Sequence, residues 1–125
     1  MIRAGQFSAL DLENIAEEIA DVGKSEQREL ASRMAVLLAH LIKWRHQPSF
    51  QSTSWQTTIR VQRDAIIRRL QKTPSLKAAL DDSDWQSDDW GDAVAQATNE
   101  TGISGFPVNC PWPMSKVISH DFTPE

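Results

Sequence analysis

The chain has 125 residues, of which 40% are hydrophobic and 24% charged, and its formal net charge is −4. These values are ordinary for one globular domain, and they exclude a chain of several large domains. A membrane-spanning helix is excluded because no apolar run reaches the roughly 18 residues that it needs. The single cysteine, Cys110, excludes an internal disulfide and a cysteine-based zinc cluster, and the first residues lack a signal-peptide pattern. We therefore expect a cytoplasmic protein without a membrane partner.

The first predicted helix covers residues 9–22. Its apolar residues recur at steps of three and four, which places them on one face of a helix. They are Leu12, Ile15, Ile19 and Val22. Ser8 can cap the beginning of the helix, and Gly23 can end it in the left-handed conformation.

The second predicted helix covers residues 26–46 and has the most regular apolar face of the chain. That face consists of Leu30, Met34, Leu37, Leu41 and Trp44. Pro48 ends the helix, because the residue before a proline avoids the helical conformation. Since only Gly23 and Lys24 connect it to the first helix, we expect the two to be antiparallel neighbours.

The third predicted helix covers residues 54–72 after a polar loop, with Ser52 or Ser54 as its cap. Its inward face consists of Trp55, Ile59, Ile66 and Leu70, and its other faces are strongly basic. A short helix should begin at Pro74, because proline suits the first helical position. In that short helix Leu76, Ala79 and Leu80 should face inward.

The last predicted helix carries a stripe of Trp90, Ala93, Val94 and Ala97 and ends near residue 101, with Gly102 as its C-cap. Residues 81–84 form a turn or cap before it. The remaining residues, 103–125, contain four prolines and should wrap the helices in extended form, with one helical turn after Trp112. The sequence thus predicts a single all-α domain over residues 1–125, an antiparallel bundle of about four main helices with a proline-rich tail.

The charges are strongly segregated along the chain. Residues 1–23 have a net charge of −4, residues 24–80 of +8 and residues 81–125 of −8. The favoured interpretation is that the acidic segments fold back and pair with the basic middle. The alternative is that the basic middle faces an acidic partner such as nucleic acid.

His40 and Glu18 are the candidate catalytic residues. His40 lies on the flank of the second apolar face, and an antiparallel pairing of the first two helices could bring Glu18 near it. Such a pair could act as an acid–base dyad or begin a metal site. The favoured alternative is a structural hydrogen bond that fixes the register of the helices. We expect no metal and no cofactor, because the three histidines are scattered and no Glu-x-x-His spacing occurs.

Candidate binding residues come from the basic middle and its tryptophans. Arginines beside aromatic rings can stack on them or clamp an anion, although they more often pair with carboxylates. The candidates are Arg60, Arg63, Arg68, Trp44 and Trp55. The aspartates of residues 81–92 lack the pattern of a calcium loop and are interpreted as solvated or paired with arginine. Cys110 is interpreted as a small buried side chain without an activating base.

Several short motifs in a fixed order resemble the bacterial family DUF29, a domain of unknown function. They include Asp11-Leu12-Glu13-Asn14, His40-Leu41-Ile42-Lys43-Trp44, Gln47-Pro48, Ser54-Trp55, Pro74-Ser75-Leu76, Glu100-Thr101-Gly102-Ile103, Phe106-Pro107 and Cys110-Pro111. The resemblance implies an all-helical fold and no established activity. Members of that family usually carry a further amphipathic helix before the position of Arg3. If the chain is truly shorter, an apolar surface near the first two helices is left open, and a homodimer is the simplest way to cover it.

Three functions therefore remain open. The first is a non-catalytic interaction module that associates with itself or with a protein partner. The second is a nucleic-acid-linked regulator, or an antitoxin-like protein, that uses the basic middle. The third is a metal-dependent helical enzyme around His40 and Glu18.

Overall fold

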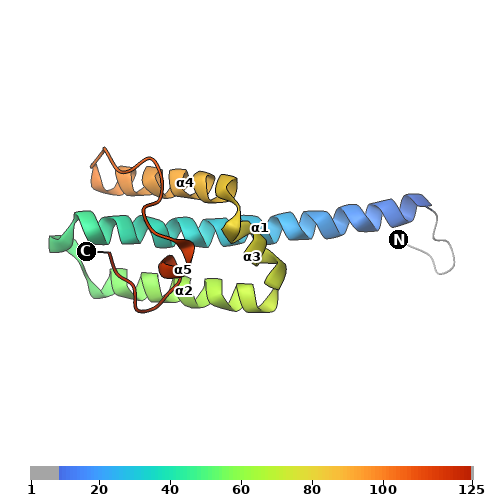
Figure 1. Ribbon diagram of the computed structural model, residues 1–125, viewed down its shortest axis with the longest axis horizontal. Coiled ribbons are helices and arrows are strands. Elements are labelled where there is room, and N and C mark those ends of the chain that lie inside the picture. Colours follow the sequence, from blue (N-terminus) through green and yellow to red (C-terminus); the bar gives the residue numbers. More distant parts are fainter. Residues whose placement is uncertain (1–8, 125) are drawn as a thin grey trace.

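The computed structural model describes the backbone of residues 9–124 and the side chains of residues 24–124. Every regular element in this part of the chain is a helix, as the sequence predicts (Figure 1). The elements are α1 (Ala9–His46), η1 (Pro48–Phe50), α2 (Thr53–Lys72), η2 (Pro74–Leu76), α3 (Lys77–Asp81), α4 (Ser83–Thr101) and α5 (Met114–Val117). None of the described helices is long and apolar enough to cross a membrane.

The prediction of two helices separated at Gly23 is wrong. Residues 9–46 form one continuous helix of 38 residues, α1, which corresponds to a length of about 57 Å. An isolated glycine inside a helix costs only about 1 kcal/mol, and no proline follows it to stop the helix. Residues 9–22 therefore continue the axis of residues 26–46, and they do not fold back along them.

Helix α1 is the central element of the bundle. It packs against both α2 and α4, which lie on opposite sides of it in Figure 1. Helix α2 runs antiparallel to α1, whereas α4 runs in the same direction as α1 (Figure 1). Leu30, Met34, Leu37, Leu38 and Leu41 of α1 have no exposed surface. A helix that is covered on two sides needs such a wide apolar surface.

The remaining helix boundaries follow local signals that the sequence carries. Helix α2 begins after Ser52, whose hydroxyl accepts a hydrogen bond from the Trp55 backbone N–H at 3.2 Å. Asp82 caps α4 in the same way, with a bond from the Asp84 N–H at 3.0 Å. Gly102 ends α4 with φ of 72°, the left-handed conformation that favours glycine. Between these helices the predicted inward residues Leu76, Ala79 and Leu80 are buried.

The proline-rich tail completes the core. It crosses α1 and places the short helix α5 between α1 and α2 (Figure 1), where Val117 is fully buried. The indole N–H of Trp90 donates to the carbonyl oxygen of Pro107 at 2.8 Å. Trp112 packs edge-on against Trp90 and Phe122, with ring centroids 5.8 and 6.0 Å away. The tail is therefore a part of the folded unit.

Substitution of the two glycines tests the continuity of α1. In a helix interior, Gly23→Ala should raise the free energy of unfolding by about 0.5–1 kcal/mol. Gly102→Ala is the matched control, and it should lower stability because alanine is strained at positive φ. Urea unfolding followed by circular dichroism measures both changes. A destabilising Gly23→Ala would mean that this glycine ends a helix.

Candidate functional site

His40 lies on α1 and is bonded to its own helix. It is half-buried, and its Nδ1 lies 2.8 Å from the carbonyl oxygen of Val36. Burial lowers the pKa of His40, and the nearby charge of Lys43 lowers it further. Nδ1–H donates to the Val36 carbonyl, which partly opposes this lowering, and the net shift of the pKa favours the neutral imidazole.

Glu18 does not belong to this site. Its side chain lies outside the described residues, but its backbone lies in the same straight helix, 22 positions before His40. At 1.5 Å per residue the separation is about 33 Å. The predicted carboxylate–imidazole pair depended on an antiparallel pairing that the continuous helix does not form. Among the residues with described side chains, no group of three histidine, cysteine or acidic residues is placed to hold a metal ion.

Lys43 is the polar centre of the bundle, and its role was not predicted. Only 6% of its surface is exposed. Its ammonium group lies 2.5 Å from Glu100 Oε2 of α4 and 5.2 Å from the ring centroid of Trp55 of α2. One side chain of α1 thus joins both flanking helices. The sequence contained a signal for this role, because Lys43 lies between Ile42 and Trp44 in an apolar run. Such a position indicates burial, and a buried lysine needs a partner for its charge.

Three of the predicted binding residues do meet in one hollow. Trp44, Arg60 and Arg63 line a hollow of about 340 Å³ together with His120 of the tail. The guanidinium of Arg63, however, is occupied by the tail, because Nε donates to the Val117 carbonyl at 2.8 Å and Nη2 to the Phe122 carbonyl at 2.7 Å. Arg63 is therefore a buried anchor for the tail. Arg60 remains exposed.

Arg68 lies at a second, more basic hollow. This hollow measures about 300 Å³, and its charged lining residues are Arg33 of α1 and Arg68, Arg69 and Lys72 of α2. One carboxylate, Glu29, pairs with both Arg33 and Arg69. The Nε of Arg33 is buried without a hydrogen-bond partner among the described residues. Four cations against one carboxylate favour an anionic ligand.

The acidic third of the chain neutralises little of this charge. Among the described side chains, one ion pair joins an acidic residue of the segment 81–124 to a lysine or arginine of the basic middle, and that pair is Lys43–Glu100. His120 adds a contact of 3.0 Å with Asp64, in which the acidic residue belongs to the middle. For the acidic segment 81–124, the predicted pairing with the basic middle is therefore wrong for most of the arginines, whereas the side chains of residues 1–23 lie outside the described residues.

Asp89 departs from the prediction that the aspartates of residues 81–92 are solvated or paired. It is 2% exposed, and neither carboxylate oxygen has a hydrogen-bond partner among the described residues. Burial raises the pKa of Asp89 to about 8, and the nearby Asp92 contributes to the rise. The sequence held a signal, because residues 89, 93 and 97 recur at steps of four on the inward stripe of α4.

Asp89 also lines a hollow of about 240 Å³ between α1 and α4. The hollow is lined on the α4 side by Trp85 and three aspartates, and on the α1 side by Lys24 and Arg28 among others. Cys110 of the tail lies near this carboxyl group. Its thiol donates to the Trp112 carbonyl at 3.3 Å. Burial raises the pKa of Cys110, which disfavours the thiolate and supports the predicted inert role.

A comparison with family models shows which family the chain is similar to. The model of the domain of unknown function DUF29 matches residues 1–123. The chain belongs to this family. Two segments that carry the likeness, His40–Trp44 and Glu100–Ile103, meet in this DUF29 domain at the Lys43–Glu100 pair. Comparisons with curated proteins and with solved structures gave no match.

Substitution of Lys43 and substitution of Glu100 should lower the stability of the protein by different amounts. Glu100→Ala leaves a buried ammonium without its carboxylate and should cost about 1–3 kcal/mol of stability. Lys43→Met keeps the apolar stem and leaves Glu100, whose side chain is 52% exposed, to water, so its cost should be smaller. Urea unfolding compares the two, with the exposed neighbour Asn99→Ala as a control. Equal effects would mean that the ammonium group is not desolvated.

Proposed function

We propose that this DUF29 domain is a helical interaction module that associates with a second copy of itself. The observation that carries the proposal is the continuity of α1. In Figure 1 the N-terminal part of α1 projects beyond α2 and α4. This projecting part contains the apolar positions Leu12, Ile15, Ile19 and Val22, whose spacing predicts one helix face.

A second copy is the occupant that the spacing and the charges favour. Steps of three and four between apolar residues are those of a helix that pairs with another helix. The segment that contains them, residues 1–23, has a net charge of −4, whereas residues 24–80 have a net charge of +8. The exposed arginines of α2 in one copy therefore offer a surface of complementary charge to the acidic residues at the beginning of α1 in the other copy. We also propose a cytoplasmic location, on the basis of the single cysteine.

Substitution on the apolar face should dissociate the assembly. We expect Ile19→Ser to shift the protein toward the monomer, because it removes apolar surface from the predicted helix–helix contact. The matched control is Glu17→Ser, which introduces the same residue on the opposite face of α1 and should leave the assembly intact. Sedimentation velocity and native mass spectrometry over a wide concentration range give the subunit number. A wild-type protein that stays monomeric throughout would contradict the proposal.

A second candidate function is supported by the basic hollow at Arg33, Arg68, Arg69 and Lys72. Because few carboxylates cover it, a phosphate backbone could contact it without displacing a folded segment. Such contact is electrostatic and independent of base sequence. This candidate is the nucleic-acid-linked regulator of the sequence analysis. It uses the same surface of α2 that the acidic helix of a second copy would use.

Charge reversal separates the two candidates. If the domain binds nucleic acid, Arg68→Glu and Arg60→Glu should each weaken binding to a short duplex and reduce the slope of log K against log salt by about one per lost phosphate contact. Lys77→Glu on α3 is the control with an equal change in charge. Fluorescence anisotropy at several salt concentrations measures the affinity. Binding that is insensitive to salt, or equally weakened by Lys77→Glu, would exclude this function.

A further inference from the structure

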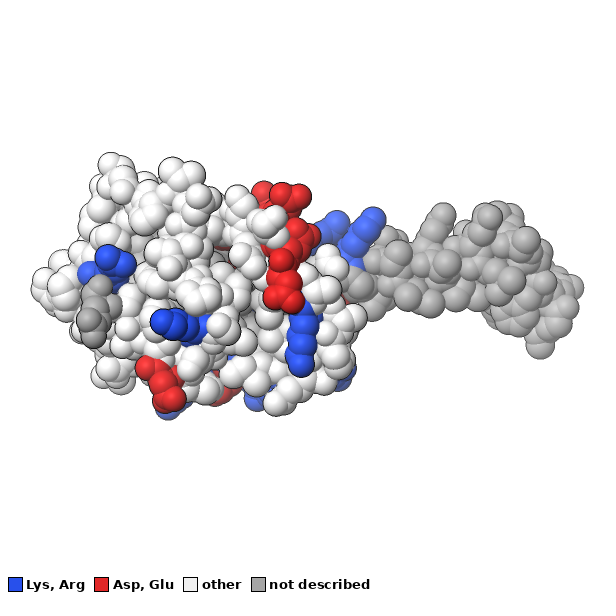
Figure 2. All heavy atoms as spheres, in the orientation of Figure 1, with Lys and Arg blue, Asp and Glu red and all other residues white. Residues whose placement is uncertain are grey.

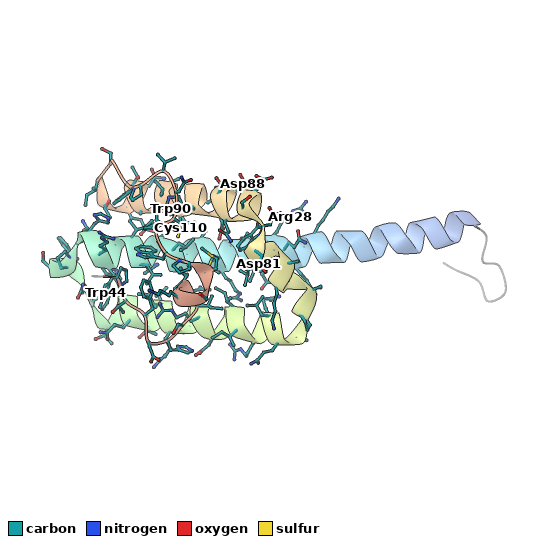
Figure 3. The ribbon with its side chains drawn as sticks, in the orientation of Figure 1. Arg28, Trp44, Asp81, Asp88, Trp90 and Cys110 are labelled. Carbon is teal, nitrogen blue, oxygen red and sulfur yellow. The ribbon has the colours of Figure 1, made fainter. Side chains whose placement is uncertain are left out.

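The hollow between α1 and the beginning of α4 has a bottom and a rim of different character. Asp89 is the most deeply buried residue that lines it, with both carboxylate oxygens shielded from solvent, and Trp85 supplies an aromatic wall that is partly exposed. Lys24, Arg28, Asp88 and Asp92 are all exposed and form the rim. Figure 3 shows Arg28 on α1 close to the beginning of α4, where Asp88 lies. In Figure 2 the acidic side chains of this region form one stripe, with basic side chains beside it.

A buried carboxyl group with two unpartnered oxygens requires a physical explanation. Such a group costs free energy unless it is neutralised or given hydrogen-bond donors. Lys24 and Arg28, the two cations that line this hollow, could donate hydrogen bonds to a carboxylate. Among the described side chains, however, neither forms an ion pair with an aspartate of the hollow. The hollow, at about 240 Å³, exceeds the space of a single water molecule.

From this arrangement we infer that the hollow binds an organic ammonium group, toward which the buried carboxylate of Asp89 turns as the acceptor, with the ring of Trp85 packed against its carbon chain. The carboxylate would supply hydrogen bonds to the charged donor. An aromatic ring beside it favours a cation with an apolar stem over a hydrated metal ion. The ammonium group can come from a free alkylamine or from a lysine side chain of another protein, since both present the same chemistry.

The rim residues act on this binding in opposite directions, according to their charge. Lys24 and Arg28 would repel an entering cation, whereas Asp88 and Asp92 would attract it. An anionic ligand would show the reverse dependence. The sign of the effect of Arg28 therefore identifies the charge of the ligand, independently of its affinity.

Binding should also displace a proton. Burial keeps the carboxyl group of Asp89 protonated until the pH rises to about 8. The groups around it are Asp88 and Asp92 of α4, Lys24 and Arg28 of α1, and the thiol of Cys110 in the tail. A bound ammonium group favours the carboxylate, so the affinity should rise as the pH approaches 8.

The test titrates n-butylammonium chloride into the full chain at pH 7.5 and follows the indole N–H of Trp85 by NMR. We expect a saturable shift in the wild type, an affinity at least about tenfold lower in Asp89→Asn, and a tighter affinity in Arg28→Ala. Asp84→Asn, an exposed aspartate of the same helix that does not line the hollow, should bind as the wild type does. Circular dichroism checks that each variant is folded.

Two further titrations complete the test. N-acetyl-lysine amide in place of butylammonium shows whether the site also takes a lysine side chain, and binding of either probe supports the inference. Sodium acetate tests the opposite charge. No saturable shift with either ammonium probe, unchanged affinity in Asp89→Asn, or acetate binding that Arg28→Ala abolishes would each overturn it. These outcomes do not depend on the oligomeric state, which is measured separately.

Discussion

The rest of the structure depends on the burial of α1 on two sides. Between Leu30 and Ile42 this helix carries eight apolar residues that have almost no contact with water, and it packs against both α2 and α4. A helix with apolar surface on one stripe can serve a two-helix contact, but a helix covered from two sides must be apolar over most of its circumference. This requirement explains why the neighbouring pairs Leu37–Leu38 and Leu41–Ile42 are all buried. The chain then places α2 and α4 beside α1 and closes the remaining opening with its tail.

Among the described side chains three ionisable residues are buried, and they differ in their partners. Lys43 has a carboxylate partner and an aromatic ring, so its charge is compensated at the meeting point of three helices. Arg63 is 2% exposed and donates to two backbone carbonyls of the tail. Both cations therefore hold segments together that are more than fifty positions apart in sequence. Asp89 has no such partner among the described residues. Asp89 therefore differs from Lys43 and Arg63, whose buried side chains hold parts of the fold together.

The sequence predicted those features whose causes are local. The beginning of α2 at a serine cap and the end of α4 at Gly102 depend on residues within one helical turn, and both predictions were confirmed. The separation at Gly23 was predicted from the same kind of signal and was wrong. A glycine can end a helix or lie inside it, and the difference of about 1 kcal/mol is decided by packing elsewhere. The tail's helical turn after Trp112 was also predicted, and α5 confirms it.

The sites were harder to predict because their partners are distant in sequence. Arg63 was proposed as an anion clamp, but the carbonyl groups it binds belong to residues 54 and 59 positions later. Lys43 and Asp89 were missed for a related reason. Each lies in a segment whose composition suggested another role, an apolar run for Lys43 and an aspartate-rich stretch for Asp89. Helical spacing was the better guide, since it places Asp89 on the same stripe as the buried Ala93 and Ala97.

The distribution of charge also constrains how copies of this chain can associate. The basic hollow lies between α1 and α2, and the hollow at Asp89 lies between α1 and α4, so α1 separates a surface suited to anions from one suited to cations. A contact between the basic hollow of one copy and the Asp89 hollow of another would be heterologous. Such a contact leaves one hollow free at each end of the assembly, so further copies can add to it. Pairing through the apolar stripe of α1 uses the same surface on both copies and is closed after two. A dimer of defined size therefore favours the stripe of α1 as the contact, and it leaves the hollow at Asp89 free for other ligands.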